Sequence, residues 1–413
     1  MKKNRVLPQG WKEVKIGDVF ETGSGGTPLS TNREYYDGGN IPWINSGELN
    51  ENYIDSTSNH ITQLGLDNSS AKIYPSGTVL VAMYGATAGK SSLLNIDACT
   101  NQAICAILEN PEYSNLFLKY NIENLYDYLV NTSTGSARDN LSQEGIAELR
   151  LFFPEGKSRQ EKLIKVLQLI DQKISLNTRI NAELEAMAKQ LYDYWFVQFD
   201  FPDENGKPYK SSGGKMVYNE TLKREIPEGW EESILSDIAN ITMGQSPDGS
   251  SYNEEGEGTV FYQGSTDFGL RFPSVRMFTT SPSRFAKKGD ILMSVRAPVG
   301  DTNIANEDCC IGRGLSAINS KIGSISHLYF ILGDLKARFD TLNGIGTTFG
   351  AITKDELYNL PVVKPNKDIL LNYEKLCSPI FDKQMTIGYE NDNLTHLRDS
   401  LLPMLMNGQV TIE

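Results

Sequence analysis

The chain has 413 residues, 39% of them hydrophobic and 22% charged, and this length predicts two or three folded domains. No apolar run is long enough to span a bilayer, the N-terminus lacks the apolar stretch of a signal peptide, and an odd number of cysteines does not predict a disulfide framework, so we expect a cytoplasmic protein. The net charge of −13 excludes a chain that grips nucleic acid through an overall basic surface; a nucleic-acid-binding face would have to concentrate its basic residues or share the task with a partner.

Residues 1–156 predict a globular domain of short strands and glycine-rich loops. Leu7–Val14 (LPQGWKEV) leads into a short amphipathic segment and then the loop Gly23–Pro28 (GSGGTP). Gly77–Ile107 reads as a turn, an apolar strand, a glycine-rich loop and two more strands. Ser133–Pro154 closes the domain with a loop, a short helix and a strand that ends in proline.

Residues 157–200 predict a long helix, because apolar residues recur at helical spacing and only Asn177 interrupts them. A helix of 30 residues is about 45 Å long. These apolar residues form a narrow stripe along one side of the helix, which is typical of helices that pair with each other. A buried polar residue such as Asn177 would fix the register of the pair. The stripe consists of Leu163, Leu167, Ile170, Ile174, Ile180, Leu184, Met187, Leu191 and Tyr194. Residues 201–225, rich in Gly, Ser and Lys, predict a surface linker.

Residues 226–365 repeat the first domain. Ile226–Ser233 (IPEGWEES) matches the opening segment, Gly289–Ile318 matches the strand-rich middle, and Asn343–Pro361 matches the closing segment. The matching loops differ in residue type: Tyr84–Thr87 corresponds to Arg296–Val299, and Asn101-Gln102 corresponds to Gly312-Arg313. The two domains should therefore share a fold and differ in what their loops bind.

Residues 366–413 predict a second long helix, in which Gln384 and Asn391 interrupt the stripe and Pro379 marks either a kink or the first turn. Its apolar positions are Tyr373, Leu376, Ile380, Ile387, Leu394, Leu401 and Leu405. The predicted architecture is α+β: two similar globular domains, and two long helices that form an antiparallel coiled coil and relate the domains by an approximate two-fold axis. The alternative is that each helix lies as an ordinary amphipathic helix on its own domain.

Several stretches, in this order and duplicated at this spacing, resemble the specificity subunits of type I restriction–modification systems over essentially the whole chain. They are GGTPLSTNREYYDGGNIPWINSGEL (Gly25–Leu49), ACTNQAICAI (Ala98–Ile107), DYWFVQFDFPDENGKPYKSSGGKM (Asp193–Met216), DCCIGRGLSAI (Asp308–Ile318) and LRDSLLPMLMNGQV (Leu397–Val410). The resemblance implies that each domain recognises one half of a split sequence in double-stranded DNA. It also implies that the helices set the spacing and dock two methyltransferase subunits, and that motor-endonuclease subunits join the complex. S-adenosylmethionine, ATP and Mg would serve those partners, whereas this chain would hold no cofactor or metal and catalyse nothing.

Two other classes of protein are alternatives, a stand-alone DNA-modifying enzyme and a coiled-coil scaffold that does not bind DNA. Gly85–Ser91 (GATAGKS) has three residues between its glycines where a P-loop needs four, and Asn110–Tyr113 (NPEY) departs from the Asn-Pro-Pro-Tyr of DNA adenine methyltransferases. The three histidines are scattered and the cysteines lack metal-ligand spacing, so the cysteines are expected in the core. A scaffold would explain the helices but not two glycine-rich heads with polar loops.

Bases are read by donors and acceptors at groove edges, while phosphates are held by basic side chains, hydroxyls and backbone amides, both presented from loops. In the first domain the candidates for DNA binding are Ser24, Gly25, Gly26, Thr27, Asn45, Ser46, Tyr84, Thr87, Lys90, Asn101, Gln102, Ser136, Arg138 and Asn140. In the second they are Gln245, Ser246, Gln263, Ser265, Arg284, Arg296, Arg313, Thr347 and Thr348. Trp11, Trp43, Trp195 and Trp230 are assigned to packing rather than to base stacking.

Overall fold

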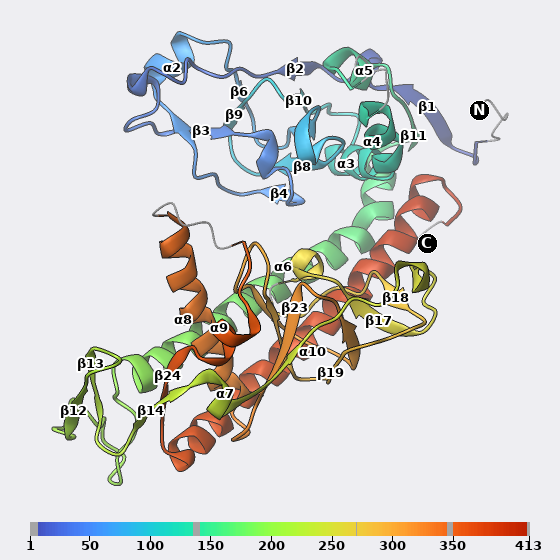
Figure 1. Cartoon of the computed structure of the whole chain (residues 1–413). Helices are drawn as coiled ribbons and strands as arrows, with labels where there is room; N and C mark the ends of the chain where they lie inside the picture. Colours follow the sequence, from blue (N-terminus) through green and yellow to red (C-terminus); the bar gives the residue numbers. More distant parts are fainter. Residues whose placement is uncertain (1–6, 135–140, 270, 345–349, 411–413) are drawn as a thin grey trace. The chain divides into compact units, whose positions relative to one another are not determined.

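The computed structural model describes residues 7–134, 141–269, 271–344 and 350–410, and the chain divides into two compact units (Figure 1). Unit 1 comprises residues 1–175 and 393–413, and unit 2 comprises residues 176–392. Each unit contains one globular head and a stretch of each of the two long helices. Among the described residues, no helix is long and apolar enough to cross a membrane.

Head 1 is built on two small mixed sheets. One has the strand order β2-β10-β7-β8-β4, the other has the order β5-β3-β9-β6, and β1 pairs separately with β11. The strands are β1 (Trp11–Lys15), β2 (Thr22–Ser24), β3 (Ile41–Ile44), β4 (Tyr53–Ile54), β5 (His60–Ile61), β6 (Ile73–Tyr74), β7 (Val79–Ala82), β8 (Ser91–Leu94), β9 (Ala98–Thr100), β10 (Ile104–Ile107) and β11 (Arg150–Pro154). Every residue of β7 and β10 is buried, because both faces of these central strands are covered.

Short helices cover the sheets of head 1. They are α1 (Ile16–Val19), α2 (Gln63–Asp67), α3 (Asn115–Glu123), α4 (Tyr126–Thr134) and α5 (Gln143–Ala147), with the 3-10 turns η1 (Arg33–Tyr35), η2 (Ser46–Glu48) and η3 (Gly85–Thr87). Phe117 and Tyr120 of α3 are fully buried in the same core as Val79 and Val81 of β7. The closing helix of the domain, expected from the sequence, is α5, and the Ser142 hydroxyl caps it by accepting a hydrogen bond from the Gly145 amide at 3.1 Å.

Head 2 repeats the strand order of head 1. The order β15-β23-β20-β21 corresponds to β2-β10-β7-β8, the run β18-β17-β22-β19 corresponds to β5-β3-β9-β6, and β14 pairs with β24 as β1 pairs with β11. The strands are β14 (Glu231–Ile234), β15 (Ala239–Met243), β16 (Tyr252–Asn253), β17 (Thr259–Tyr262), β18 (Phe278–Thr279), β19 (Phe285–Ala286), β20 (Ile291–Ser294), β21 (Thr302–Ile304), β22 (Cys309–Ile311), β23 (Leu315–Ser320) and β24 (Pro361–Lys364). Its helical elements are α7 (Leu235–Ile238), η5 (Gly249–Ser251), η6 (Ser265–Asp267), α8 (Ile325–Gly344) and α9 (Lys354–Tyr358). The predicted α+β fold with an internal repeat is confirmed.

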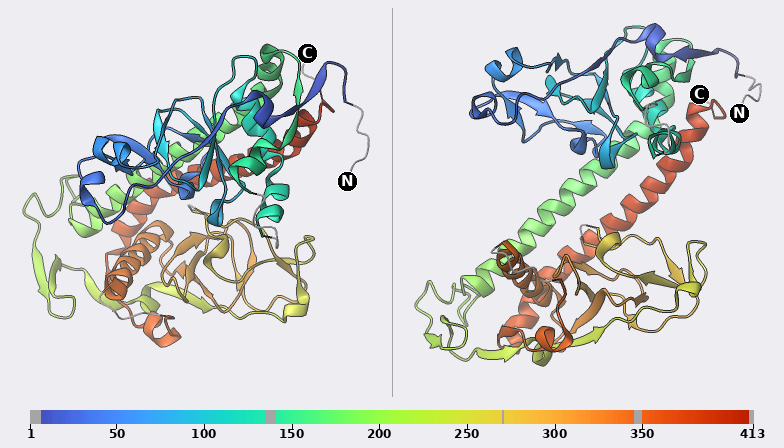
Figure 2. Two further views of the ribbon diagram at one scale, coloured as in Figure 1. Left: turned by 90° about the horizontal axis from the view of Figure 1, so that it is seen from above. Right: turned by 45° about the horizontal axis from the view of Figure 1, so that its top comes forward.

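Two long helices, α6 (Lys157–Tyr192) and α10 (Lys367–Met406), run beside each other within each unit (Figure 2). At about 1.5 Å per residue, their 36 and 40 residues span roughly 54 and 60 Å. In unit 1, Leu163 and Leu167 of α6 pack in one core with Leu402 and Leu405 of α10.

The pairing is antiparallel, as expected. In unit 2 the side chain of Asn177 donates to Asn391 at 2.8 Å, and that of Gln384 donates to the carbonyl oxygen of Asn181 at 3.1 Å. Residue numbers therefore rise along α6 as they fall along α10. The polar interruptions of the two stripes meet in the structure, which explains why both sequences break the apolar pattern there.

Part of the predicted stripe is not buried between the helices. Ile180, Met187 and Tyr194 of the first stripe and Leu376 of the second are exposed, so the expectation that the whole stripe is covered by the partner helix was wrong. The inward positions near that end of α6 are instead taken by other residues of the same core, Ala188, Tyr192 and Trp195. The long helix was expected over residues 157–200, but α6 ends at Tyr192 and a π-helical turn, η4 (Asp193–Val197), follows it.

Two further expectations need correction. The segment predicted as a linker contains a hairpin, β12 (Met216–Asn219) and β13 (Arg224–Pro227). The Asn219 side chain closes the hairpin turn by accepting hydrogen bonds from two backbone amides, and Lys223 takes a positive φ of 51°. Pro379 lies inside α10, which begins at Lys367, and so it is not in the first turn.

Candidate nucleic-acid interface

In head 1, four loops meet at one edge of the two sheets. Strands β3 and β9 pair in parallel, so their carboxyl ends, followed by Asn45 and Asn101, lie at the same edge. Strands β2 and β7 both run antiparallel to β10, so their carboxyl ends lie beside the amino end of β10. We call this set polar edge 1; it consists of Ser24–Thr27, Asn45-Ser46, Tyr84–Thr87 and Asn101-Gln102.

Side-chain hydrogen bonds tie these loops together. The Thr27 hydroxyl donates to Oε1 of Gln102 at 2.5 Å, and Nδ2 of Asn101 donates to Oδ1 of Asn45 at 3.3 Å. The Thr87 hydroxyl donates to the Ser46 carbonyl at 2.7 Å. In this arrangement Gln102 and Asn45 use their oxygens inside the protein, which leaves their amide N–H groups to act as donors.

Not every predicted residue of head 1 is placed to touch a ligand. Gly25, Gly26 and Thr87 are buried. A Cβ on Gly25 would lie 1.9 Å from the Thr100 carbonyl oxygen, so glycine is required for the loop to approach β9. These three positions support the edge from inside. Ser24, Asn45 and Ser46 are half-buried, Thr27, Tyr84 and Gln102 are exposed, and Lys90 lies beyond the 3-10 turn, where Nζ donates to Oδ1 of Asn50 at 2.7 Å.

Head 2 builds the same edge from different residues. Strands β17 and β22 pair in parallel and are followed by Gln263 and by Gly312-Arg313. Strands β15 and β20 both run antiparallel to β23, so Gln245-Ser246 and Arg296 follow their carboxyl ends beside the amino end of β23. We call this set polar edge 2; it consists of Gln245-Ser246, Gln263–Ser265, Arg284, Arg296 and Arg313.

Hydrogen bonds also hold polar edge 2 together. The backbone amide of Gln245 donates to the carbonyl of Ile311 at 3.0 Å, and that of Ile311 donates to the carbonyl of Arg284 at 2.9 Å. The backbone amide of Arg313 donates to the Ser246 hydroxyl at 3.2 Å. Ser265 begins the turn η6 and is half-buried, while Gln245 and Gln263 are exposed.

The three arginines of polar edge 2 concentrate positive charge in an acidic chain. Arg284, Arg296 and Arg313 are exposed and make no ion pair with any described residue. Arg276 of the same head is different, because its Nε lies 2.9 Å from a carboxylate oxygen of Asp267. An unpaired guanidinium keeps its five donors for a ligand, and the planar group suits both guanine edges and phosphates.

Five predicted residues, Ser136, Arg138, Asn140, Thr347 and Thr348, lie outside the described residues. The assignment of all four tryptophans to packing is confirmed, since each is buried. The five cysteines are free and buried, as expected of core residues. Burial raises the pKa of Cys105 and of Cys309 to about 12, which makes both poor nucleophiles.

The stretches that resembled catalytic motifs have other structures. Gly85–Ser91 forms the turn η3 and runs into strand β8, whereas a P-loop runs into a helix. Asn110 makes a local turn, its side chain accepting a hydrogen bond from the Glu112 amide at 2.8 Å. Over the described ranges, no three His, Cys, Asp or Glu residues cluster to hold a metal ion.

A groove on the helix pair of unit 2 was missed by sequence reasoning. Its volume is about 890 Å³, and residues of α6, of η4 and of α10 line it, among them Met187, Leu191, Tyr194, Leu376 and Ile380. Met187 and Leu376 are each 51% exposed. Apolar spacing alone could not separate these positions from the seam of the pair, because both faces of α6 carry apolar residues.

The family model for the type I restriction modification DNA specificity domain matches residues 8–186 and 227–380. The chain is 27% identical to the MjaIX type I restriction enzyme specificity subunit of Methanocaldococcus jannaschii, over 98% of this chain and 95% of that one. It is 31% identical to the putative MjaX specificity subunit of the same organism, over 70% of this chain and 66% of that one. The crystal structure of a type I restriction-modification system S subunit from M. genitalium has a TM-score of 0.56 at 16% identity, covers 98% of each chain and has this fold. The chain therefore belongs to the family of type I restriction–modification DNA specificity subunits and carries two copies of the recognition domain.

Proposed function

We propose that head 1 and head 2 each read one half of a bipartite DNA site, head 1 through polar edge 1 and head 2 through polar edge 2. The observation that supports this most is the reuse of the same strand ends with different side chains. Amide and hydroxyl groups form polar edge 1, and three exposed arginines dominate polar edge 2. Because base discrimination depends on which donors and acceptors reach the groove, the two edges would read different half-sites.

The methyltransferase subunits would supply catalysis and part of the contacts to the DNA phosphates. With a net charge of −13 the chain alone would bind DNA weakly, since phosphate contacts dominate affinity. We assign the apolar groove of unit 2 to a helix of a methyltransferase subunit. Exposed apolar side chains on a long helix gain most by burial against a second apolar helix. Such a complex would work in the cytoplasm, where a prokaryotic cell keeps its DNA.

The proposed division of recognition can be tested by mapping the methylated adenines across a genome. The chain is produced with a methyltransferase subunit, methylated adenines are mapped, and residues 1–156 are then exchanged for the matching domain of a relative. One half-site should change, while the other half-site and the spacer stay the same. Inserting about four residues, one helical turn, near Asn177 should change the spacer alone. An exchange that alters both half-sites contradicts the division of recognition.

The absence of catalysis in this chain is tested separately. The purified chain, incubated with DNA and labelled S-adenosylmethionine, should transfer no methyl group until the methyltransferase subunit is added. Transfer by the chain alone would show that it is an enzyme. A complex that assembles but shifts no DNA would favour the scaffold.

A further inference from the structure

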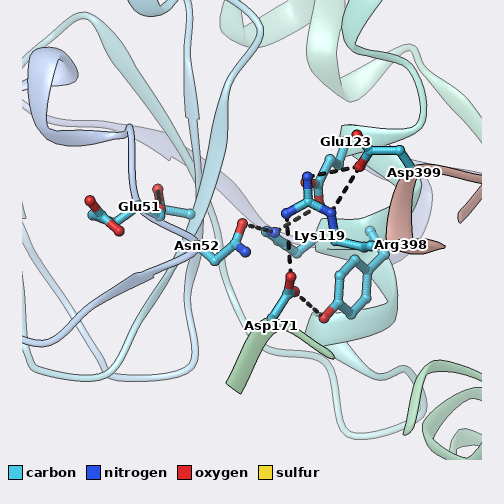
Figure 3. Close-up of polar contacts among 9 residues, drawn as sticks. Glu51, Asn52, Lys119, Glu123, Asp171, Arg398 and Asp399 are labelled. Carbon is cyan, nitrogen blue, oxygen red and sulfur yellow. Dashed lines mark hydrogen bonds and ion pairs between the residues drawn. The ribbon is translucent and has the colours of Figure 1, made fainter. Parts of the chain in front are cut away.

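In unit 1 the carboxylate of Asp171 joins three elements (Figure 3). Asp171 lies on α6 and is 4% exposed. Its Oδ2 accepts a hydrogen bond of 2.6 Å from the hydroxyl of Tyr120 on α3 of head 1. Its Oδ1 lies 3.4 Å from a guanidinium nitrogen of Arg398 on α10. One buried carboxylate therefore holds the head and the second helix at the same time.

We call the contacts of Asp171 with Tyr120 and Arg398 the joint of unit 1. The protonation states of Tyr120 and Arg398 favour these contacts. Burial, with Asp171 beside it, raises the pKa of Tyr120 well above its usual range, so the hydroxyl remains a donor. Desolvation lowers the pKa of Arg398, but Asp399, which accepts its hydrogen bonds, and the carboxylates of Glu123 and Asp171 outweigh that effect and raise it overall. Both partners of Asp171 thus stay in the form that binds a carboxylate.

The residue before Tyr120 in α3 attaches the helix to the loops of head 1. Lys119 is 1% exposed, and its Nζ donates to Oδ1 of Asn52 at 2.6 Å and to Glu123 at 2.7 Å (Figure 3). In the same segment, Oδ1 of Asn50 accepts from Lys90, which follows the loop of polar edge 1. Neighbouring residues of α3 thus contact the helix pair through Tyr120 and the segment 50–52 of head 1 through Lys119.

Unit 2 contains a joint of the same kind made from other residues. Oε2 of Glu185 on α6 pairs with the guanidinium of Arg271 from head 2. The same oxygen accepts a hydrogen bond of 3.2 Å from Nε2 of Gln384 on α10. Arg271 is 3% exposed, and its guanidinium carbon lies 4.1 and 4.0 Å from the ring centres of Tyr329 and Phe381. Each joint thus consists of a carboxylate of α6, one side chain of the head and one of α10.

We propose that Asp171 and Glu185 are positioning residues that fix the direction of each head on the helix pair and thereby narrow the range of spacer lengths that the protein accepts. This inference rests on the proposed reading of a bipartite site. Apolar contacts between head and helix are non-directional, whereas a carboxylate with two partners restricts rotation as well as distance. One base pair of B-DNA is about 3.4 Å long, so heads that swing by a few ångströms would accept neighbouring spacer lengths.

The variants remove polar contacts and keep side-chain size. Asp171→Asn and Glu185→Gln remove the charge of each joint, and Tyr120→Phe removes only the hydroxyl on the head side, in case the charge variants fold poorly. Glu183→Gln is the control, because Glu183 is an exposed carboxylate on α6 whose side chain makes no hydrogen bond or ion pair with the described residues. Each variant is assembled with the methyltransferase subunits, and its unfolding temperature is recorded.

The first measurement needs no DNA. Spin labels at the exposed positions Lys72 of head 1 and Lys162 of α6 report the distance between head and helix within unit 1. The distance distribution should widen in Asp171→Asn and Tyr120→Phe and stay unchanged in Glu183→Gln. If the distance distribution is equally wide in the parent and in all three variants, Asp171 and Tyr120 do not fix the direction of head 1, and the proposal is wrong.

The second measurement uses duplexes with the mapped half-sites and spacers of varied length. The preference for the natural spacer over one a base pair longer or shorter should fall about ten-fold in the joint variants, as expected for a lost charge-assisted hydrogen bond. Discrimination against a mismatch within a half-site should not change. If both preferences fall together, the carboxylates are merely structural. If the unmodified complex shows no preference for a spacer length, the proposed reading of a bipartite site is wrong. If the unmodified complex shows the preference and the joint variants keep it, only the positioning role of Asp171 and Glu185 is wrong.

Discussion

Asn177 of α6 donates a hydrogen bond from Nδ2 to Oδ1 of Asn391 of α10 across 2.8 Å, at a position where the Asn177 side chain is 1% exposed. The same amide donates to Oε2 of Glu390 at 2.9 Å. A polar pair inside an apolar seam is satisfied in one register only, because a shift of either helix would bury its groups without partners. The pair therefore selects the alignment of α6 against α10 in unit 2.

Replacing one member of this pair should cost more than replacing both. Asn177→Leu removes the donor to Asn391 and should lower the free energy of unfolding by about 1–3 kcal/mol. Adding Asn391→Leu should recover much of that loss, since two leucines pack without an unsatisfied amide. Urea unfolding of the two single variants and the double variant measures the coupling. Strictly additive losses would show that the two amides do not depend on each other.

Arg313→Ala should alter recognition of one half-site only. Arg313 belongs to polar edge 2, and none of its guanidinium donors is used by the described residues. If it grips a guanine edge, discrimination at one base pair of that half-site falls by about 1–3 kcal/mol; if it holds a phosphate, affinity for all sequences falls together and the salt dependence weakens. Binding to duplexes with single substitutions in each half-site separates these results.

The control for Arg313 is Lys321→Ala. Lys321 follows the opposite end of β23, where its Nζ donates to the carbonyl of Ser236, so its loss should leave sequence preference unchanged. A changed preference in the half-site of head 1 after Arg313→Ala would be incompatible with separate reading by the two heads.

Met187→Asp should block assembly with the methyltransferase subunit. Met187 lines the apolar groove of unit 2 and is 51% exposed, so the variant should fold normally. A charge buried in an apolar interface without a partner would weaken binding strongly. Co-purification and size-exclusion chromatography give the result. Val217→Asp, on the exposed hairpin of the same unit, is the control and should assemble normally. Normal assembly of Met187→Asp would place docking elsewhere.

Unit 2 should lose stability as the pH falls below about 6.5. Burial lowers the pKa of His327 from 6.5 to about 3, and its ring lies 4.3 Å from that of Phe196. Between these pH values the unfolded chain binds a proton that the folded chain does not, so the free energy of unfolding falls by at most about 1.4 kcal/mol per pH unit. His327→Gln should remove this contribution. The difference in unfolding free energy between parent and variant, measured at pH 7.5 and at pH 5, should therefore shrink or reverse at pH 5; a constant difference would contradict it.

The sequence predicts the repeat and the polar loop residues better than it predicts which faces of the helices are covered. Asn45 and Gln263 could be chosen as loop residues that offer hydrogen-bond donors and acceptors, but the parallel pairing that places each of them beside a second strand end is seen only in the structure. Met187 could not be placed, since helical spacing gives the position of a side chain around one helix but not which face the partner covers. The exposure of that face depends on tertiary packing.

The carboxylate joints were also beyond prediction. Asp171 and Glu185 sit among charged residues of α6 that are mostly exposed, and nothing in their spacing separates them from Glu183. Only the burial of Tyr120 and Arg271 against them reveals a role. The hairpin after η4 was missed for a related reason: its turn depends on a side-chain cap by Asn219, while its composition is that of a loop.

Each head begins and ends on paired strands: Trp11 of β1 lies opposite Pro154 of β11, and Glu231 of β14 lies opposite Lys364 of β24. The two points at which the chain enters and leaves a head are thus held next to each other by backbone hydrogen bonds that do not depend on the side chains of the loops. At the level of the gene, such a head corresponds to a segment with two defined boundaries, which can be exchanged as a unit. If each head reads one half-site as proposed, recombination at those two boundaries would exchange that half-site in one step and leave the residues of the helices unaltered.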